Sequence, residues 1–536
     1  MQAFANLLDR LLLTPSRNGK LRLLEDYFRD QPDPIRGYGL AAITRDLDIR
    51  SVKPAMLRAL VEERMDPILF GYSYDYVGDM AETIALTWPA EFTGINELLR
   101  LDDVVHQLNE ASRATGPKLL EGWLHRLDAS GRYALIKLVT GGLRIGVSSR
   151  LAKQALANFG GVDVNEIEEL WHGLEPPYLP LFDWLEGRTD KPQNLAAAPF
   201  RPVMLATSFE EPDHARYEPA DYMAEWKWDG IRVQVASERG VRRLYSRTGD
   251  DISGTFPDLL EAMDFEGTLD GELLVRKPLD LEPDARIEVA TFSDLQQRLN
   301  RKTVSKKLLV SHPAFIRAYD LLFDGAEDLR TLPFEDRQRR LTAFMQDLDP
   351  SRFDQSEQLT FDSWDDLARH RADPPSPVIE GVMIKRRGAP YVPNRPKGEW
   401  FKWKRDPMLI DAVLMYAQRG HGKRSSFYSD YTFGVWKDEG LVPVGKAYFG
   451  FTDEELKQID KYVRDNTVDR FGPMRAVKAT RDQGLVLEVA FEGLQRSKRH
   501  KSGVAMRFPR ISRLRWDKPA HEADTIENVE ALLPPE

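Results

Sequence analysis

The chain has 536 residues, of which 42% are hydrophobic, and its 75 basic and 85 acidic side chains give a formal net charge of −10. It lacks cysteine, which excludes disulfides, thiolate metal sites and thiol nucleophiles and suits a reducing cytoplasm. No stretch approaches the ~18 consecutive apolar residues that a membrane span needs. The N-terminal apolar run contains Asp9 and Arg10, so it predicts a helix rather than a signal peptide.

Residues 1–185 predict an α-helical domain. Segments such as 104–114 and 119–128 have apolar residues at three- and four-residue spacing, the period of an amphipathic helix. Within this region Arg144 lies in the sequence GGLRIGVS, where glycines on both sides let the backbone approach a groove closely. Arg144 is therefore a candidate nucleic-acid contact, although scattered basic residues are also typical of solvated helix faces.

The rest of the chain predicts a linker followed by two strand-rich domains. Six prolines between Pro176 and Pro202 interrupt periodic structure, and we place the linker at 186–205. Short strands separated by turns, with some helices, predict an antiparallel domain over 206–405. Evenly spaced strands over 406–536 predict a small barrel or sandwich. The predicted class is multidomain α+β.

Lys227 lies in the segment AEWKWDGIRVQV, residues 224–235. Apolar residues alternate along this segment, an Asp-Gly turn breaks their phase, and the lysine falls on the opposite face beside that turn. A solvent-facing strand lysine is the ordinary interpretation of such a residue. The alternative is a nucleophile, because burial and nearby cations lower the pKa of a lysine from ~10.4 towards neutrality.

Basic residues are concentrated near the C-terminal end. Between Leu494 and Lys518 the chain has nine lysines and arginines and one acid, Asp517. Such a run is usually a solvated face, but its density and the interleaved Phe508 and Trp516 favour contact with phosphate groups.

Six further segments follow Lys227. They are YSRTGDD (245–251), LDGELLV (269–275), RAYDLL (317–322), IEGVMIKR (379–386), FKWKR (401–405) and MRFPRISR (506–513). With EWKWDGIR, in this order and spacing, they resemble the ATP-dependent DNA ligases of the covalent nucleotidyltransferase superfamily. The stretch LIKLVTGGLRIGVSSRLAKQALA (135–157) is similar to part of the DNA-binding domain of the large ligases.

The resemblance spans nearly the whole chain and implies three domains. These are an all-α N-terminal DNA-binding domain, an ATP-grasp-like antiparallel β nucleotidyltransferase (adenylation) domain and a C-terminal OB-fold β-barrel. It also implies an enzyme that seals nicks in duplex DNA, joining a 5′-phosphate to a 3′-hydroxyl with ATP as co-substrate. The family reaction passes through a lysyl–AMP, here on Lys227, and an adenylylated DNA.

The family motifs imply roles for residues around Lys227. Glu225 accepts from the adenine amino group, Tyr319 stacks on adenine, and Arg232 and Arg247 hold the ribose and the nick phosphates, so that both arginines also contact DNA. A core tyrosine in an apolar strand is the alternative interpretation of Tyr319.

Two acids and a set of lysines complete the predicted site. Glu272 and Glu380 offer the hard oxygen ligands that suit Mg²⁺, for which Mn²⁺ can substitute. In the family the first of these acids also contacts the ribose. Lys402 and Lys404 are two residues apart and so face one side of a strand, towards the α-phosphate by resemblance. Lys385 is a further cation.

The chain departs from the family pattern at one position. Many ligases have an arginine six residues before the first of the paired lysines, where this chain has Pro396. Arg395 and Lys397 flank that proline and either can fill the role; we take Arg395 as the nucleotide-binding candidate.

Arg507 and Arg510 match the last motif, RxPR. In the family this segment orients the β- and γ-phosphates of ATP, which would give the basic cluster between 494 and 518 a function as a pyrophosphate clamp and a DNA contact.

Two other classes of protein compete with this interpretation. An RNA ligase or an mRNA capping enzyme shares KxDG and the later lysines, but the long helical N-terminal region and Glu225 argue against both. A non-catalytic DNA-binding scaffold is the second alternative, although all the expected catalytic residue types are present.

The remaining expectations concern partners and location. We expect nicked double-stranded DNA as the partner, no membrane association and a monomer. Repair, replication and recombination are the expected processes, with protein partners in trans unspecified. Without a targeting signal, the expected location is the cytoplasm of a prokaryote, associated with the nucleoid.

Overall fold

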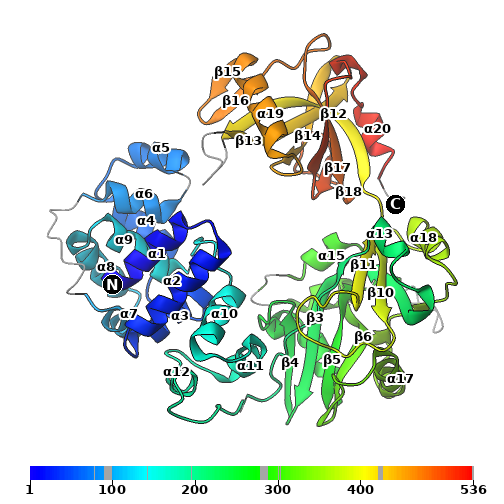
Figure 1. Cartoon of the computed structure of the whole chain (residues 1–536). Coiled ribbons are helices and arrows are strands. Elements are labelled where there is room, and N and C mark those ends of the chain that lie inside the picture. The colour runs from blue at the N-terminus through cyan, green and yellow to red at the C-terminus, as the bar shows by residue number, and fades with distance from the viewer. Residues whose placement is uncertain are drawn as a thin grey trace. The chain divides into compact units, whose positions relative to one another are not determined.

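The structure of the chain is a computed structural model (Figure 1). It describes residues 1–77, 79–89, 99–141, 143–194, 196–277, 288–299, 301, 304–419 and 427–533. They form two compact units, one of residues 1–70 and 80–405 and one of residues 71–79 and 406–536.

The described part of residues 1–185 is helical, drawn in blue to cyan in Figure 1. The helices are α1 (Gln2–Leu13), α2 (Arg17–Asp30), α3 (Ile35–Thr44), α4 (Pro54–Glu62), α5 (Pro67–Val77), α6 (Met80–Thr87), α7 (Leu101–Glu110), α8 (Gly116–Arg126), α9 (Ala129–Thr140), α10 (Ser149–Gly160), α11 (Val164–Leu170) and α12 (Leu179–Leu185). None of the described helices combines the length and apolar character that a membrane crossing requires.

The α9–α10 region shows why this sequence forms separate short helices. Gly141 ends α9 in the left-handed conformation that glycine adopts without strain, at φ 66°. Ser148 then begins α10, because its hydroxyl accepts from the backbone N–H of Leu151. Both helices bury apolar residues, among them Leu135 and Leu156, in one continuous helical core. Packing of these faces stabilises helices that are too short to persist alone.

Residues 206–405 contain two sheets, drawn mainly in green in Figure 1. The strands of the first sheet, in spatial order, are β1 (Thr207–Ser208), β11 (Trp400–Lys404), β10 (Ile379–Arg386), β2 (Tyr222–Trp228) and β9 (Gln358–Leu359). Those of the second are β4 (Val241–Ser246), β3 (Ile231–Glu238), β5 (Gly267–Val275), β6 (Ala314–Asp324) and β7 (Glu327–Asp328), with β8 (Phe353–Gln355) also paired to β6. Most pairs are antiparallel, as predicted; β1–β11 and β6–β8 are parallel.

The Asp-Gly turn after Lys227 carries the chain from one sheet to the other. β2 ends at Trp228 in the first sheet and β3 begins at Ile231 in the second. A Cβ on Gly230 would lie 2.6 Å from the carbonyl oxygen of Leu273 and 2.7 Å from Cγ of Glu272, so only glycine fits where the two sheets meet. The alternating segment 224–235 is therefore two strands rather than one, and a site can form between them.

Short helices cover these sheets. They are α13 (Glu211–His214), α14 (Pro257–Glu261), α15 (Phe292–Gln296), α16 (Lys306–Ser311), α17 (Phe334–Met345) and α18 (Trp364–Ala372). The contact of α17 with β6 includes a fully buried ion pair, in which Arg337 donates to both oxygens of Asp320 at 2.8 and 2.9 Å. Both charges are therefore compensated inside the core.

The second unit is built around β12 (Met408–Arg419). Neighbouring strands follow the order β14 (Gly440–Ala447), β13 (Tyr428–Lys437), β12, β16 (Met474–Val477) and β15 (Thr467–Phe471), and β17 (Val486–Phe491) pairs with both β12 and β20 (Arg510–Arg515). β18 (Gly493–Arg496) and β19 (Val504–Arg507) form a hairpin. Helix α19 (Asp453–Asp465) begins with a capping box of Thr452 and Glu455, and α20 (Ile526–Glu530) lies near the C-terminal end.

His172 links the helical region to the second sheet and should make stability depend on pH. Its ring centroid lies 5.5 Å from that of Phe200 and 5.2 Å from that of Tyr245, and burial lowers its pKa to about 4. In the unfolded chain the imidazole of His172 takes up a proton near pH 6.5. The stabilisation that the neutral, buried ring gives to the folded state is therefore complete above that pH. It is lost as the pH falls towards 4, at a cost of up to about 3 kcal/mol.

We therefore expect His172→Phe to reduce the fall in unfolding midpoint between pH 7 and pH 5 relative to the parent chain. His106→Asn is the matched control, because His106 is exposed on α7. Equal pH dependence in the parent and the His172 variant would contradict the assignment.

Candidate active site

The register of β2, β10 and β11 places several predicted residues on one face of the first sheet. Residues directly opposite each other on neighbouring antiparallel strands project to the same side. The cross-strand rows are Lys227–Gly381–Lys404 and Glu225–Met383–Lys402. The lysine of the KxDG motif and the two later lysines therefore share one face with Glu225.

Glu380 reaches this face through an irregularity in β10. The pairing with β2 shifts register between Ile379 and Gly381, and Gly381 has φ 150°. A Cβ at Gly381 would overlap the carbonyl oxygen of Trp403, so the strands approach closely only because this residue is glycine. The Glu380 carboxylate forms an ion pair with Nζ of Lys227, and Nζ of Lys404 lies 4.0 Å away. Lys227 is only 22% exposed, which differs from a solvent-facing strand lysine.

The second sheet contributes Arg232, held in a fixed orientation. Arg232 on β3 donates to the two carboxylate oxygens of Asp270 at 3.0 and 2.6 Å. Tyr391 donates to the same carboxylate at 2.6 Å and receives a bond from Arg232 at 3.2 Å. A bidentate contact to a fully buried carboxylate fixes the plane of the guanidinium.

Glu272 lies opposite Arg232 on β5. Burial raises the pKa of its carboxyl group to about 8; Lys227 and Arg232 oppose the shift, and Glu380 and Asp270 add to it. A partly buried carboxylate that is influenced by a second acid is stabilised by a cation, and Glu272 with Glu380 offers the oxygen donors that Mg²⁺ prefers. No group of three or more His, Cys, Asp or Glu side chains arranged for a metal occurs among the residues that the structure describes.

Glu225 is buried and forms an ion pair with Lys385, with side-chain exposures of 3% and 1%. Burial raises the pKa of Glu225, and the positive charge of Lys385 opposes that shift. Tyr319 lies beside the pair, with its ring centre 4.3 Å from Nζ of Lys385. The sequence predicts Lys385 as a further cation of the site, and the structure shows that its charge is directed at Glu225.

Four further cations influence one another. Burial lowers the pKa of Lys402, and the charges of Lys404, Arg395 and Lys227 add to the effect. Burial also lowers the pKa of Arg247, again with a contribution from Arg395. Arg395, one of the two residues that flank Pro396, contributes to both shifts.

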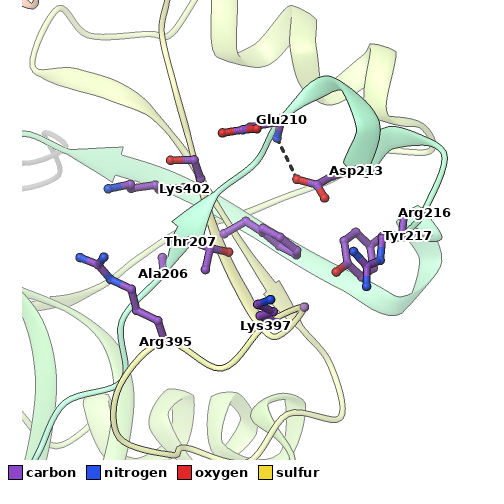
Figure 2. A pocket seen from close by; sticks show the side chains of 12 residues that line it. Ala206, Thr207, Glu210, Asp213, Arg216, Tyr217, Arg395, Lys397 and Lys402 are labelled. Atoms are coloured by element: carbon purple, nitrogen blue, oxygen red, sulfur yellow. Dashed lines mark hydrogen bonds between the residues drawn. The ribbon is translucent and has the colours of Figure 1, made fainter. Parts of the chain in front are cut away.

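A pocket of about 420 Å³ adjoins these cations at the edge of the first sheet (Figure 2). Arg395 and Lys402 extend to the same side of the strand that carries Thr207 (Figure 2). In another part of the pocket wall, Asp213 accepts a hydrogen bond from the backbone N–H of Glu210 at 2.9 Å. The residues lining the pocket are Ala206, Thr207, Ser208, Glu210, Asp213, Arg216, Tyr217, Arg395, Lys397, Gly398, Phe401 and Lys402. Arg395 and Lys397, the two residues that flank Pro396 and are candidates for the role of the family's arginine, both line the pocket.

The other predicted residues lie elsewhere in the fold. Arg144 is exposed between α9 and α10, while its neighbours Leu143 and Ile145 are buried. Arg507 and Arg510 belong to the second unit, where burial lowers the pKa of Arg507 and Arg510 lies 3.6 Å from Glu492.

Sequence reasoning missed Tyr391, and it did not identify the partners of Asp270 and Lys385 within the site. Tyr391 and Asp270 orient Arg232, and Lys385 compensates Glu225, although each pair is far apart in sequence. The spacing of Asp270 and Glu272, two residues apart on one strand, was a usable signal that Asp270 faces the site. No local pattern marks Tyr391, because its contact depends on long-range packing.

Comparisons with known proteins identify the family of this chain. Residues 203–404 match the family model of the ATP dependent DNA ligase domain, and residues 424–518 match that of the ATP dependent DNA ligase C terminal region. A probable DNA ligase of Koribacter versatilis is 33% identical over 466 residues, which cover 81% of this chain and 78% of the relative. DNA ligase 1 of Korarchaeum cryptofilum is 29% identical, with 99% of this chain and 98% of that protein covered.

Among solved structures, the one titled Pmar-Lig_PreS3 has a similar fold, with a TM-score of 0.60 and 15% sequence identity over 96% of this chain and 99% of that one. The likeness in sequence to the Koribacter ligase, over most of both chains, identifies the family. The chain belongs to the ATP-dependent DNA ligases, enzymes whose general activity is the sealing of nicks.

Proposed function

We propose that this protein joins the 5′-phosphate and 3′-hydroxyl at a nick in duplex DNA, and that Lys227 is the residue that carries AMP. The observation that carries the assignment is the contact of Lys227 with Glu380 inside a cluster of cations and carboxylates. An amine held at a defined position next to charge-neutralising groups suits an in-line displacement at phosphorus, where positioning and electrostatics supply most of the catalysis.

The first step forms a P–N bond between Nζ of Lys227 and the α-phosphorus of ATP and breaks the bond to pyrophosphate. Nζ must lose a proton, and the Glu380 carboxylate is in contact with it. Lys402, Lys404 and Arg395 are the cations proposed to spread the negative charge of the phosphates. AMP then passes to the 5′-phosphate of the nick, and the 3′-hydroxyl displaces it to close the backbone.

Recognition of the nucleotide and the nick is assigned to the second sheet and to Glu225. Arg232, fixed by Asp270, and Arg247 are proposed to hold the ribose and the nick phosphates. Tyr319 offers a ring face for stacking on adenine, and Glu225 is proposed to accept from its amino group.

Mg²⁺ fits the pair Glu272 and Glu380, because both offer carboxylate oxygens and a bound cation would favour the ionised form of Glu272, which burial disfavours. Bound there, the ion would neutralise charge on the phosphates of ATP. Mn²⁺ should substitute, since it accepts similar oxygen ligands.

The remaining assignments concern domains and DNA. We propose that residues 1–185 are the DNA-binding domain, 206–405 the adenylation domain and 406–536 an OB-fold. Arg144 is proposed to contact DNA, and Arg507 and Arg510 to orient the β- and γ-phosphates. Contacts to phosphates and the minor groove carry little sequence information, so binding should be insensitive to sequence and sensitive to salt.

We further propose that the protein acts as a monomer in a prokaryotic cytoplasm, associated with the nucleoid. The proposal of a prokaryotic source draws on the relatives named above, which come from Koribacter versatilis and Korarchaeum cryptofilum.

A nick-sealing assay tests the proposed function. The protein is incubated with a nicked DNA duplex, or with a matched nicked RNA duplex, and with ATP, GTP or NAD as the nucleotide. We expect sealing of DNA with ATP and a divalent cation, and little with NAD. Preferential sealing of RNA would favour an RNA ligase, and the absence of both sealing and covalent labelling would favour a non-catalytic scaffold.

A further inference from the structure

Lys385 has an unusual environment for a lysine. It lies on β10 with its side chain 1% exposed, and its ion-pair partner is Glu225, 3% exposed on β2. Three aromatic rings surround its Nζ, with ring centres at 4.3 Å for Tyr319, 4.4 Å for Trp400 and 5.0 Å for Phe334. The rings belong to β6, β11 and α17, so several elements together build this cage.

An ammonium group in such a place needs compensation. Removal of an ammonium group from water costs several kcal/mol. A carboxylate and the negative faces of aromatic rings compensate this cost only when they lie close to the charge. Among the described residues, Glu225 is the carboxylate that forms an ion pair with Lys385. The next acid on these elements, Asp320, is already paired on both oxygens with Arg337. The charge of Lys385 therefore acts chiefly on Glu225.

The protonation state of Glu225 decides which base it can recognise. An ionised carboxylate only accepts hydrogen bonds, so it suits the amino group of adenine and repels the carbonyl oxygen of guanine. A protonated carboxyl group gains a donor and can bond to that carbonyl oxygen. A residue that holds Glu225 ionised would thereby exclude guanine without touching either base.

We propose that Lys385 is a positioning residue that sets the nucleotide selectivity of the enzyme by holding Glu225 as an acceptor-only carboxylate. The inference rests on the proposed role of Glu225 in adenine recognition and extends it to a residue on another strand. Because Lys385 lies beneath the ring of Tyr319, loss of the cation would also alter the surface on which a base stacks.

The charged and titratable surroundings of Glu225 support this assignment. Burial and the negative charge of Asp320 raise the pKa of Glu225, whereas Lys385 and a hydrogen bond with Ser356 lower it. Nε2 of Gln358 on β9 lies 3.5 Å from a carboxylate oxygen of Glu225, and this side chain carries no charge. The charge of Arg337 is compensated by Asp320. Burial already outweighs Lys385 in its effect on the pKa of Glu225, so loss of the lysine removes the main opposition and favours the protonated form further. The effect on selectivity should therefore grow as the pH falls.

The test measures covalent adenylylation and guanylylation of the protein with α-labelled ATP and GTP, as kcat/KM, between pH 6 and 8. We expect Lys385→Met to lower the ATP/GTP ratio by about tenfold or more, the scale of losing one polar discrimination. The ratio should fall further towards pH 6. Lys137→Met is the matched control, since Lys137 is a buried lysine of the helical region, and it should leave the ratio unchanged.

A second variant keeps the test decisive if Lys385→Met does not fold. The double variant Glu225→Gln with Lys385→Met buries no net charge and so avoids an unpaired ion. Its amide offers both a donor and an acceptor, so its ATP/GTP ratio should approach unity at every pH. In the Glu225→Gln background, the further change of Lys385 should not move the ratio, because its target carboxylate is gone.

Two results would overturn the proposal. One is an unchanged ATP/GTP ratio in Lys385→Met across this pH range. The other is a double variant that retains the parental preference for ATP. Failure of the proposed function gives a different result, namely no covalent label from ATP in the parent protein.

Discussion

Replacing Lys227 by arginine is expected to abolish covalent labelling of the protein by α-labelled ATP. Arginine keeps the positive charge that pairs with Glu380, but its guanidinium does not become neutral in proteins and cannot supply the nucleophile. We expect a loss on the order of 10⁴-fold or more, the scale observed when an enzyme loses its nucleophile. Gel-based detection of the label, with circular dichroism to verify the fold, measures the effect.

The same variant separates the first chemical step from the last. Nicked DNA that already carries AMP on its 5′-phosphate needs no attack by lysine, so Lys227→Arg should still seal it. We expect its sealing rate to stay within about tenfold of the parent rate, because the substitution removes at most one charge-assisted contact. Lys306→Arg, on the exposed side of α16, is the control for the substitution itself. If the variant were labelled by ATP as well as the parent, Lys227 would not be the nucleophile.

Gly381→Ala is expected to destabilise the first unit and to impair adenylylation together. Gly381 has φ 150°, and a Cβ there would overlap the carbonyl oxygen of Trp403 on β11. Backbone strain alone costs about 1–3 kcal/mol, and relief of the overlap must separate β10 from β11. That separation moves Glu380 and Lys404, the neighbours of Lys227. We expect a loss of about 3 kcal/mol or more in unfolding free energy and at least about tenfold in labelling rate.

Gly388→Ala is the matched control for this prediction. Gly388 lies in the turn that follows β10, and a Cβ there meets nothing within 4 Å. Its substitution should change the unfolding free energy by no more than about 1 kcal/mol and leave labelling intact. If Gly381→Ala behaved like Gly388→Ala in both measurements, the close approach of β10 and β11 would not support the site.

Local patterns in the sequence predict the class of the fold well. The three- and four-residue apolar spacing of residues 119–128 corresponds to helix α8 (Gly116–Arg126). The two-residue spacing of Lys402 and Lys404 corresponds to one face of β11. Both patterns depend on short-range periodicity, which each segment carries by itself.

The division of the segment around Lys227 into strands of two sheets could not be predicted from alternation. The apolar pattern of 224–235 marks a turn at Asp229 and Gly230, where its phase breaks, but it does not show that the chain changes sheet there. The close packing of Gly230 against β5 shows that change. Likewise, the register shift that turns Glu380 towards Lys227 depends on the pairing of β10 with β2. Register is a property of two strands, so neither strand's sequence specifies it alone.

Lys385 illustrates the same limit for charged residues. Its sequence neighbours indicate a cation near phosphates, whereas the structure places it between Glu225 and three rings that come from other parts of the chain. Motifs indicate which residue types a reaction needs. The partners that set the charge state of those residues come from tertiary packing.

The central claim is most directly tested by locating the adenylate on the protein. The parent chain is incubated with ATP and a divalent cation, digested, and analysed by peptide mass spectrometry under conditions that preserve a phosphoramidate. We predict one AMP on the peptide that contains Lys227, removed when pyrophosphate is added in excess. An adenylate on any other residue, or none in a preparation that seals nicked DNA, would contradict the account.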